Sequence, residues 1–173
     1  CKSTYKQYNY LWIWSRLIMG CCLFFFGKLP DFTSNRILIM LDYFRFHHIG
    51  YAVNDIDTTA DYYIKAGWGL SIQVIDKNQN TKIAFLTKSN FPLIELVSPV
   101  DDKSPIVKTL DKMGVTPYHV CYEVDDIYLA VSDLRKKRFI PLFDPIEAIA
   151  LGNRKICYLF NKDVGLIELL NKV

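Results

Sequence analysis

The sequence predicts an α+β fold in which one unit, a strand followed by a helix and three strands, occurs twice. Three observations lead to this prediction. The chain resembles itself at an offset of 71 residues, each copy opens with a histidine in an apolar strand, and each copy ends in a strand with a glutamate at its centre. With 173 residues, 51% of them hydrophobic, the chain can form one domain, or two small halves that share a core.

The repeat is visible when FHHIGYAVNDID, residues 46–57, is set over PYHVCYEVDDIY, residues 117–128. Five positions are identical in the two segments, namely His48/His119, Tyr51/Tyr122, Val53/Val124, Asp55/Asp126 and Ile56/Ile127. Further along, LIELV at 93–97 matches LIELL at 166–170. The offset is 71 residues for the first match and 73 for the second, and similarity at such a nearly constant offset indicates a duplicated structural unit.

In the first half, we expect a strand over residues 46–53 and a helix over residues 57–66. An Asp/Thr-rich segment caps this helix and Gly67 ends it. The turn signals KNQN and KSN then separate three further strands, near residues 70–76, 81–88 and 92–98.

The second half repeats this order. Asp125 or Asp126 caps a helix that reaches about Arg138, and three strands follow, near residues 139–143, 154–160 and 165–170. Between the halves, SPIVKTLDKMG at 104–114 predicts a linking helix with Ser104 as its cap and Gly114 as its end.

Alternation along the first strand of each half separates the histidines, because successive side chains point to opposite faces. The face toward the helix carries Ile49, Tyr51 and Val53, matched by Val120, Tyr122 and Val124. The opposite face carries His48, Gly50 and Ala52, matched by His119, Cys121 and Glu123. His47 falls with the apolar set and matches Tyr118, so we expect it at the core rim without a ligand role.

The glutamates of the two LIEL segments, Glu95 and Glu168, also need an explanation, because a carboxylate in an apolar strand is costly unless it is paired or binds a metal. Packing of the two halves about a pseudo-twofold axis would bring both of them toward His48 and His119. Imidazole nitrogens and carboxylate oxygens suit a divalent metal ion. In the alternative, the glutamates pair with lysines at strand ends and the histidines are satisfied core residues.

These motifs resemble one family. HHIGYAVNDI with LIELVSP, followed by YHVCYEVDDI with GLIELL, is similar to the vicinal oxygen chelate superfamily, which includes glyoxalase I, methylmalonyl-CoA epimerase, extradiol dioxygenases and bleomycin resistance proteins. The resemblance covers residues 45–173, as modules 45–100 and 117–173. It implies two βαβββ modules that form a cup-shaped mixed sheet around a divalent metal. The metal ligands that it implies are His48, Glu95, His119 and Glu168.

The resemblance also implies a reaction class, which is proton abstraction next to a carbonyl group. The order and spacing of SPIVKTLDKMG, EVDDI, AVSDLRKK and DVGLIELL are similar to methylmalonyl-CoA epimerases. Glyoxalase I usually carries Asn-Trp-Gly and DPDGY-like elements where this chain has SPVDDKSP and NKDVG. The separate catalytic glutamate of epimerases has no match in SIQVIDKNQNTKIAF. We therefore expect Glu168 to act as the base, with Glu95 as its symmetry-related partner.

Two alternatives stay open beside an epimerase of a small-molecule thioester. One is glyoxalase I, a lactoylglutathione lyase, and the other is a non-catalytic binding protein of the same fold. The sequence does not distinguish Co, Ni, Zn, Mn and Mg as the metal. We expect a homodimer and no nucleic-acid partner, because no basic stripe with interleaved aromatic residues is present.

Residues 1–44 differ from the rest of the chain and form a hydrophobic N-terminal extension. Segment 8–27 is a candidate membrane anchor, and it also resembles a signal segment without a clear cleavage site. We favour a third interpretation, an extension upstream of a natural start at Met40. The five cysteines form no metal-binding spacing or even disulfide set, which favours reduced thiols and a cytoplasmic protein unless segment 8–27 anchors it to a membrane.

Overall fold

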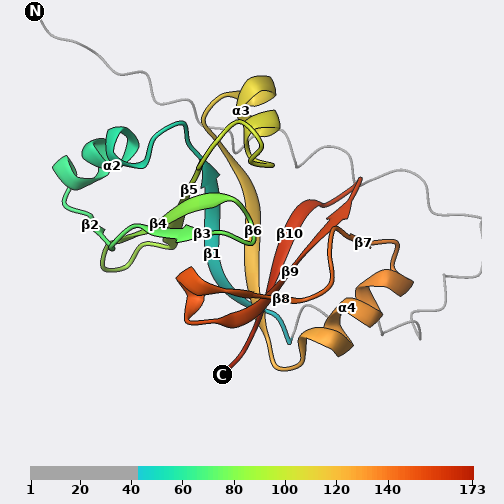
Figure 1. The fold of residues 1–173 in the computed structure, drawn as a ribbon. Helices are drawn as coiled ribbons and strands as arrows, with labels where there is room; N and C mark the ends of the chain where they lie inside the picture. Colours follow the sequence, from blue (N-terminus) through green and yellow to red (C-terminus); the bar gives the residue numbers. More distant parts are fainter. Residues whose placement is uncertain (1–42) are drawn as a thin grey trace, which may run out of the picture. The chain divides into compact units, whose positions relative to one another are not determined.

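The computed structural model describes residues 43–173 (Figure 1). The expectations for segment 8–27 and for a start at Met40 lie outside these residues. Within residues 43–173, none of the helices combines the length and the apolar character needed to cross a membrane.

The first half contains the expected strand, helix and further strands. The helix is capped by Asp55, whose side chain accepts a hydrogen bond from the Thr58 backbone N–H at 2.7 Å, and Gly67 follows its end with a φ of 82°. The elements are β1 (Arg45–Ala52), α2 (Ile56–Lys65), β2 (Gly69–Leu70), β3 (Val74–Asp76), β4 (Thr81–Thr87) and β5 (Leu93–Pro99).

The strand expected over residues 70–76 is divided into β2 and β3. The division has a local cause at Ser71, whose hydroxyl accepts a hydrogen bond from the Phe85 backbone N–H at 2.8 Å. A side chain thus takes the place of a backbone carbonyl in the ladder, and residues 71–73 leave the strand.

The second half shows the same order with more irregular additions. Its elements are β6 (Thr116–Val124), α4 (Ile127–Lys136), β7 (Ile140–Pro141), β8 (Ile146–Ala148), a 3-10 turn η1 (Ile149–Leu151), β9 (Arg154–Asn161) and β10 (Gly165–Asn171). Asp126 is the residue that caps α4, because its side chain accepts from the backbone N–H groups of Tyr128 and Leu129. The helix ends at Lys136, two residues before the expected end, and Arg138 has a left-handed φ of 67°.

The linking helix α3 (Val107–Met113) begins two residues later than expected. Ser104 does not cap it, because the Ser104 backbone carbonyl accepts from the Val107 N–H while its hydroxyl is buried without a partner. The predicted end at Gly114 is confirmed, with a φ of 68°.

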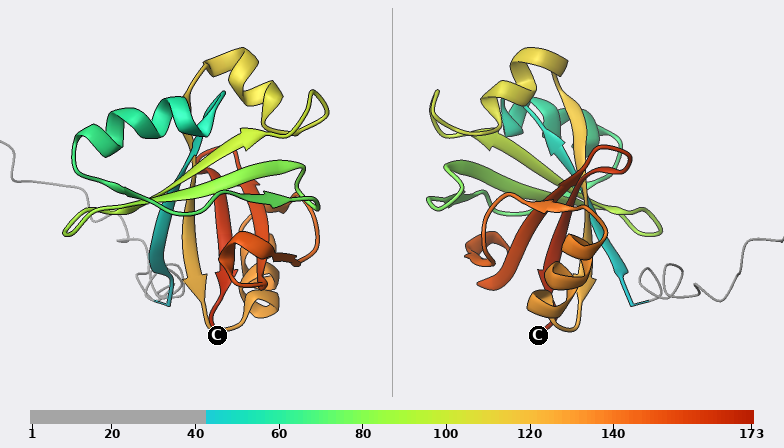
Figure 2. Two further views of the ribbon diagram at one scale, coloured as in Figure 1. Left: turned by 60° about the vertical axis from the view of Figure 1, so that its left-hand side comes forward. Right: turned by 90° about the vertical axis from the view of Figure 1, so that its right-hand side faces the viewer.

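All ten strands form one mixed sheet in the order β2-β4-β5-β1-β6-β10-β9-β7, with β3 on β4 and β8 on β9 (Figures 1 and 2). At its centre β1 and β6 pair antiparallel, and each has a parallel neighbour on its other side, β5 beside β1 and β10 beside β6. The prediction of two βαβββ modules in one curved sheet is confirmed.

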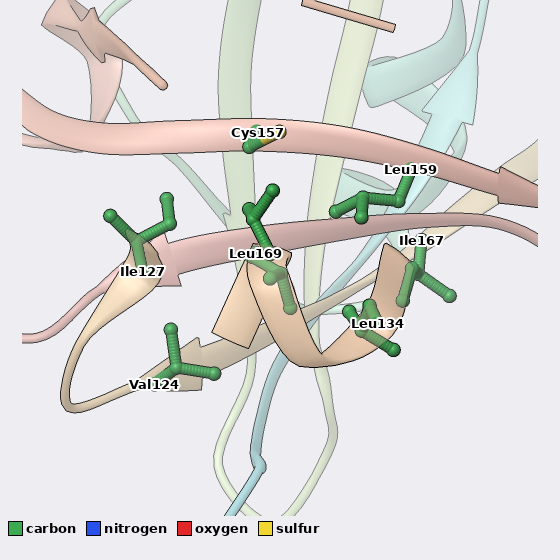
Figure 3. Packing of buried hydrophobic residues seen from close by; sticks show 8 residues of the cluster. Val124, Ile127, Leu134, Cys157, Leu159, Ile167 and Leu169 are labelled. Atoms are coloured by element: carbon green, nitrogen blue, oxygen red, sulfur yellow. The ribbon is translucent and has the colours of Figure 1, made fainter. Parts of the chain in front are cut away.

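Each module has its own core between its helix and the sheet. Helix α4 packs on Cys157, Leu159, Ile167 and Leu169 of β9 and β10 (Figure 3). Helix α2 packs on a corresponding cluster that includes Leu96, and Tyr51 packs against that cluster as predicted. Burying one large aliphatic side chain stabilises a fold by about 1.5–3 kcal/mol. The two cores therefore stabilise the face of the central strands that packs against the helices. The opposite face of these strands is available for a functional site.

Candidate metal centre

The four central strands each contribute one side chain to a single buried cluster. Glu95 lies on β5, His48 on β1, His119 on β6 and Glu168 on β10. The strand register explains the convergence, because Gly50 is opposite both Glu95 and His119, and Cys121 is opposite Glu168. Each module thus supplies one histidine and one glutamate from equivalent positions.

The ligand atoms of the four residues lie close together. Nε2 of His48 is 3.1 Å from Nε2 of His119. Oε2 of Glu168 lies 3.1 Å and 3.2 Å from these two nitrogens, and Oε2 of Glu95 lies 3.3 Å and 3.5 Å from them. The side chains are at most 3% exposed, so water does not screen their charges.

This arrangement fits a divalent metal ion. Oε2 of Glu95 and both carboxylate oxygens of Glu168 are buried without a hydrogen-bond partner, although histidine nitrogens lie nearby. Leaving buried carboxylates unpaired is costly. Nitrogen and oxygen ligands bind zinc-like ions at about 2.0–2.2 Å, so neighbouring ligand atoms around such an ion lie about 3–3.5 Å apart. The ligand atoms of the cluster have separations in this range. The ion pairs of both glutamates are with histidines rather than lysines, contrary to the alternative drawn from the sequence.

The charges of the cluster depend strongly on one another. Burial opposes the charged form of His48, but the carboxylates of Glu95 and Glu168 outweigh it and raise the pKa of His48 to about 10. Burial likewise favours neutral Glu168, but the rings of His119 and His48 hold the pKa of that carboxyl well below its usual value. Without a metal ion, a proton on His48 therefore balances part of the negative charge of the two carboxylates. A bound metal ion would balance this charge instead.

Gly50 provides the space for one of these rings. A Cβ atom at Gly50 would lie 1.9 Å from Cε1 and 2.5 Å from Nε2 of His119. No side chain fits at such a distance, so the ring of His119 lies directly over the Gly50 backbone. Gly50 was predicted on this face of the strand, and the position of the His119 ring explains why no larger residue fits there.

His47 does not lie where alternation predicts. The register of β1 and β6 shifts between Phe46 and His48, which makes His47 the extra residue of a β-bulge. Its ring turns to His48, with 2.8 Å between the two Nδ1 atoms. The expectation that His47 faces the helix side is therefore wrong, because a bulge resets the alternation.

A polar chain continues from His47 toward the surface. Nε2 of His47 lies 3.2 Å from Nη2 of Arg154, whose Nη1 donates a hydrogen bond to Oε2 of Glu123 at 2.8 Å. Burial and the charges of His48 and Arg154 lower the pKa of His47, which keeps this ring neutral. The chain joins a residue of the first module to two residues of the second.

Two tyrosines that were not predicted as site residues lie beside the cluster. Tyr118 is the extra residue of a second bulge, in β6, where the register shifts between Gly50 and Tyr51 of the partner strand. The rings of Tyr118 and Tyr158 contact the ring of His119, with centroid distances of 4.5 Å and 5.1 Å. Burial raises the pKa of both hydroxyls well above the usual value. Alternation in KICYLF, which places Tyr158 opposite Cys157 and Leu159, is the signal that indicates its face.

A cavity of about 1060 Å³ opens beside these tyrosines. Its wall combines both modules, with the turn 78–81 from the first and residues 142–147 from the second. The cavity is lined by aromatic and aliphatic side chains that include Tyr118, Tyr158, Phe143, Leu166 and, near the start of α3, Ile106. Cavities that hold cofactors and small substrates typically measure about 300–1,000 Å³. This cavity therefore has room for a small acyl group and part of a carrier attached to it.

Comparison with known proteins agrees with the fold and the cluster. Methylmalonyl-CoA epimerase, mitochondrial, from Mus musculus is 33% identical over 129 residues, which are 72% of this chain and 71% of the mouse protein. Ethylmalonyl-CoA/methylmalonyl-CoA epimerase from Cereibacter sphaeroides is 29% identical over 131 residues, 72% of this chain and 96% of that protein.

Among solved structures, methylmalonyl-CoA epimerase from Mycobacterium tuberculosis superimposes with a TM-score of 0.67 at 28% identity, over 75% of this chain and 88% of that one. The family model for the Glyoxalase/Bleomycin resistance protein/Dioxygenase superfamily matches residues 47–158. That range includes three of the four clustered residues, and the fourth, Glu168, follows on β10. The chain belongs to the glyoxalase/bleomycin resistance protein/dioxygenase superfamily.

Proposed function

We propose that this protein is a divalent-metal-dependent epimerase that inverts the carbon next to the carbonyl group of a methylmalonyl-CoA-like thioester. The observation that carries the proposal is the convergence of two buried histidines and two buried glutamates beside a cavity large enough for an acyl thioester. The similarity to proteins named methylmalonyl-CoA epimerase favours this reaction over that of a lactoylglutathione lyase.

His48, Glu95, His119 and Glu168 would hold the ion. A bound divalent ion acts as a Lewis acid, which makes the α-proton of a neighbouring thioester easier to remove. Two imidazoles with two carboxylates suit a first-row transition ion better than Mg²⁺, which prefers oxygen ligands alone. We therefore place Co²⁺, Ni²⁺, Zn²⁺ and Mn²⁺ ahead of Mg²⁺ as the ion to test.

Glu168 is our candidate for the base, because its Oε2 lies among the two histidine nitrogens while its Oε1 is buried without a partner. One oxygen can remain a ligand while the other takes the α-proton. Glu95 approaches the same two nitrogens from the other module. A carboxylate on each side of the pseudo-twofold axis can serve opposite faces of a planar carbon, which inversion at that carbon requires.

Hydrogen–deuterium exchange tests the proposal. We expect the purified protein to retain a divalent metal after dialysis and to exchange the α-hydrogen of methylmalonyl-CoA in D₂O, as followed by NMR. Glu168→Gln should reduce exchange by at least about 100-fold, the scale of a lost general base. Asp163→Asn, in the exposed turn before β10, is the matched control and should exchange like the wild type.

Two results would contradict the proposal. One is a dialysed protein without metal that also shows no exchange after addition of Co²⁺, Zn²⁺ or Mn²⁺. The other is exchange that persists at the wild-type rate in Glu168→Gln, which would leave the metal centre in place but remove Glu168 from the role of base.

A further inference from the structure

Two tyrosines form the part of the cavity wall that reaches the candidate metal centre. Tyr118 and Tyr158 both line the cavity, and both rings contact the ring of His119 at nearly perpendicular angles of 87° and 81°. The charged residues of the same wall, Lys103 and Glu147, are exposed and make no contact with His119 that resembles those of the two tyrosines.

The backbone fixes the position of Tyr118. As the extra residue of the β6 bulge, it lies next to His119 and turns toward the cavity, although strict alternation would place it on the helix side. Tyr158 reaches the same place from β9, and its ring packs on Phe143 at 5.8 Å. Two different strands thus bring the two hydroxyls together.

The two hydroxyls are hydrogen-bonded to each other. Because each phenol has one hydrogen to donate and one of the two makes this bond, the other O–H is left for another acceptor. The hydroxyl that accepts in such a pair is polarised and becomes a stronger donor. Tyr118 has the ring nearer to His119, which favours it as the residue that donates to a ligand.

We propose that Tyr118, supported by Tyr158, donates a hydrogen bond to the thioester carbonyl oxygen of the substrate. The bond strengthens as negative charge builds on that oxygen during removal of the α-proton. The hydrogen stays on Tyr118 throughout, so the tyrosine stabilises charge and transfers no proton. The inference rests on the proposed function, because it assigns a donor to the substrate of that reaction.

Tyr118→Phe tests the inference in the metal-loaded protein. We expect kcat for α-hydrogen exchange of methylmalonyl-CoA to fall about 100-fold, as for other fixed donors to a developing oxyanion, while KM and bound metal stay near wild-type values. Tyr158→Phe should have a smaller effect, about tenfold, because Tyr158 acts through Tyr118. Tyr122→Phe is the matched control, since Tyr122 lies on the same strand and packs with Phe44 away from the cavity.

A binding measurement separates charge stabilisation from general packing. The probe 2-nitronate-propionyl-CoA is a planar anion whose negative charge is shared between its nitro group and its thioester oxygen, whereas propionyl-CoA has neither the charge nor the nitro group. Calorimetry should show that Tyr118→Phe loses at least tenfold in affinity for the nitronate and less than about threefold for propionyl-CoA, because a donor to the thioester oxygen stabilises the anion more than the neutral thioester.

The outcomes distinguish the two proposals. If the wild type exchanges the α-hydrogen and Tyr118→Phe matches it in kcat and in nitronate affinity, the assignment of Tyr118 is overturned and the epimerase proposal stands. Loss of metal from Tyr118→Phe would also overturn the assignment, because the tyrosine would then support His119 instead of the substrate. Absence of exchange by the wild type, with metal bound, would overturn both proposals.

Discussion

The two modules share a backbone design but use the residue before the histidine differently. In the first module that residue is His47, and it faces a polar chain of Arg154 and Glu123. In the second module it is Tyr118, and it faces the cavity. Both residues occupy β-bulges at equivalent places in the duplicated sheet.

The difference indicates that the two modules surround their cluster histidines with different groups. On one side, Nδ1 of His48 lies beside Nδ1 of His47, whose Nε2 is in turn 3.2 Å from the Arg154 guanidinium. On the other side, Nδ1 of His119 is buried without a partner, and aromatic rings hold the histidine instead. Partners behind a ligand histidine orient it and tune its affinity for metal. Under the proposed function, we therefore expect the contact of His47 to support the metal ion bound by His48, and Tyr118 to contact the substrate.

Substitution of the two neighbouring histidines should produce the largest contrast. His48→Ala should abolish metal binding, because it removes a ligand. His47→Ala should still bind metal, but with an affinity lowered by about 10- to 100-fold, the usual result of losing a hydrogen-bond partner of a metal ligand. Competition with a chelating dye measures both affinities.

If His47→Ala and the wild type bind metal with equal affinity, the contact between the two histidines does not contribute to metal binding. Equal affinity of His48→Ala and the wild type would remove His48 from the ligand set. Co²⁺ absorption spectra add a readout of geometry, since His47→Ala should shift the visible bands while His48→Ala should lose them.

A second contrast compares Gly50 with Cys121, which follow the two ligand histidines at equivalent positions. Gly50→Ala places Cβ within 1.9 Å of the His119 ring and must displace it. We expect a loss of stability of about 1–3 kcal/mol from overpacking, together with weaker metal binding. Cys121→Ala removes one sulfur atom from a buried thiol and should leave metal affinity nearly unchanged.

Thermal unfolding of the metal-free and metal-loaded forms measures both changes. If Gly50→Ala binds metal like the wild type, the ring of His119 has another position that keeps it a ligand, and the close approach to Gly50 is not required. A strong loss of metal in Cys121→Ala would show that the thiol is part of the centre.

Much of the fold and the cluster followed from the repeat. Matching LIELV with LIELL and one histidine strand with the other was enough to choose His48, Glu95, His119 and Glu168, because a duplicated unit places equivalent residues about one axis. Capping residues located both module helices to within about two residues.

What the sequence did not predict depends on irregular backbone. Alternation holds only in an unbroken strand, so the bulge at His47 reversed its predicted face, and the equivalent bulge concealed Tyr118. The partnership of His47 with Arg154 joins residues 107 positions apart, and local patterns carry no signal for such a contact. Strand β8 is held by its pairing with β9, and turn η1 lies against β3, so neither short segment depends on a periodicity of its own.

The smallest expected effect concerns protons in the metal-free centre, where the two histidines of the first module differ again. Glu95 and Glu168 raise the pKa of His48 to about 10, above its ordinary value of 6.5, whereas the pKa of His47 is lowered. A raised pKa means that the folded form binds the proton more tightly than the unfolded form. This stabilisation is complete below pH 6.5 and is lost as the pH rises through about 10.

The melting temperature of the protein treated with a chelator should therefore fall as the pH is raised from 6.5 toward 10. The metal-loaded protein is the control, because a metal ion takes the place of the proton on His48 and removes this contribution to the slope. Metal affinity should rise over the same range, since the ion competes with one proton fewer. Parallel melting curves for the two forms would show that His48 holds no such proton, and the two carboxylates would then need another source of compensating charge.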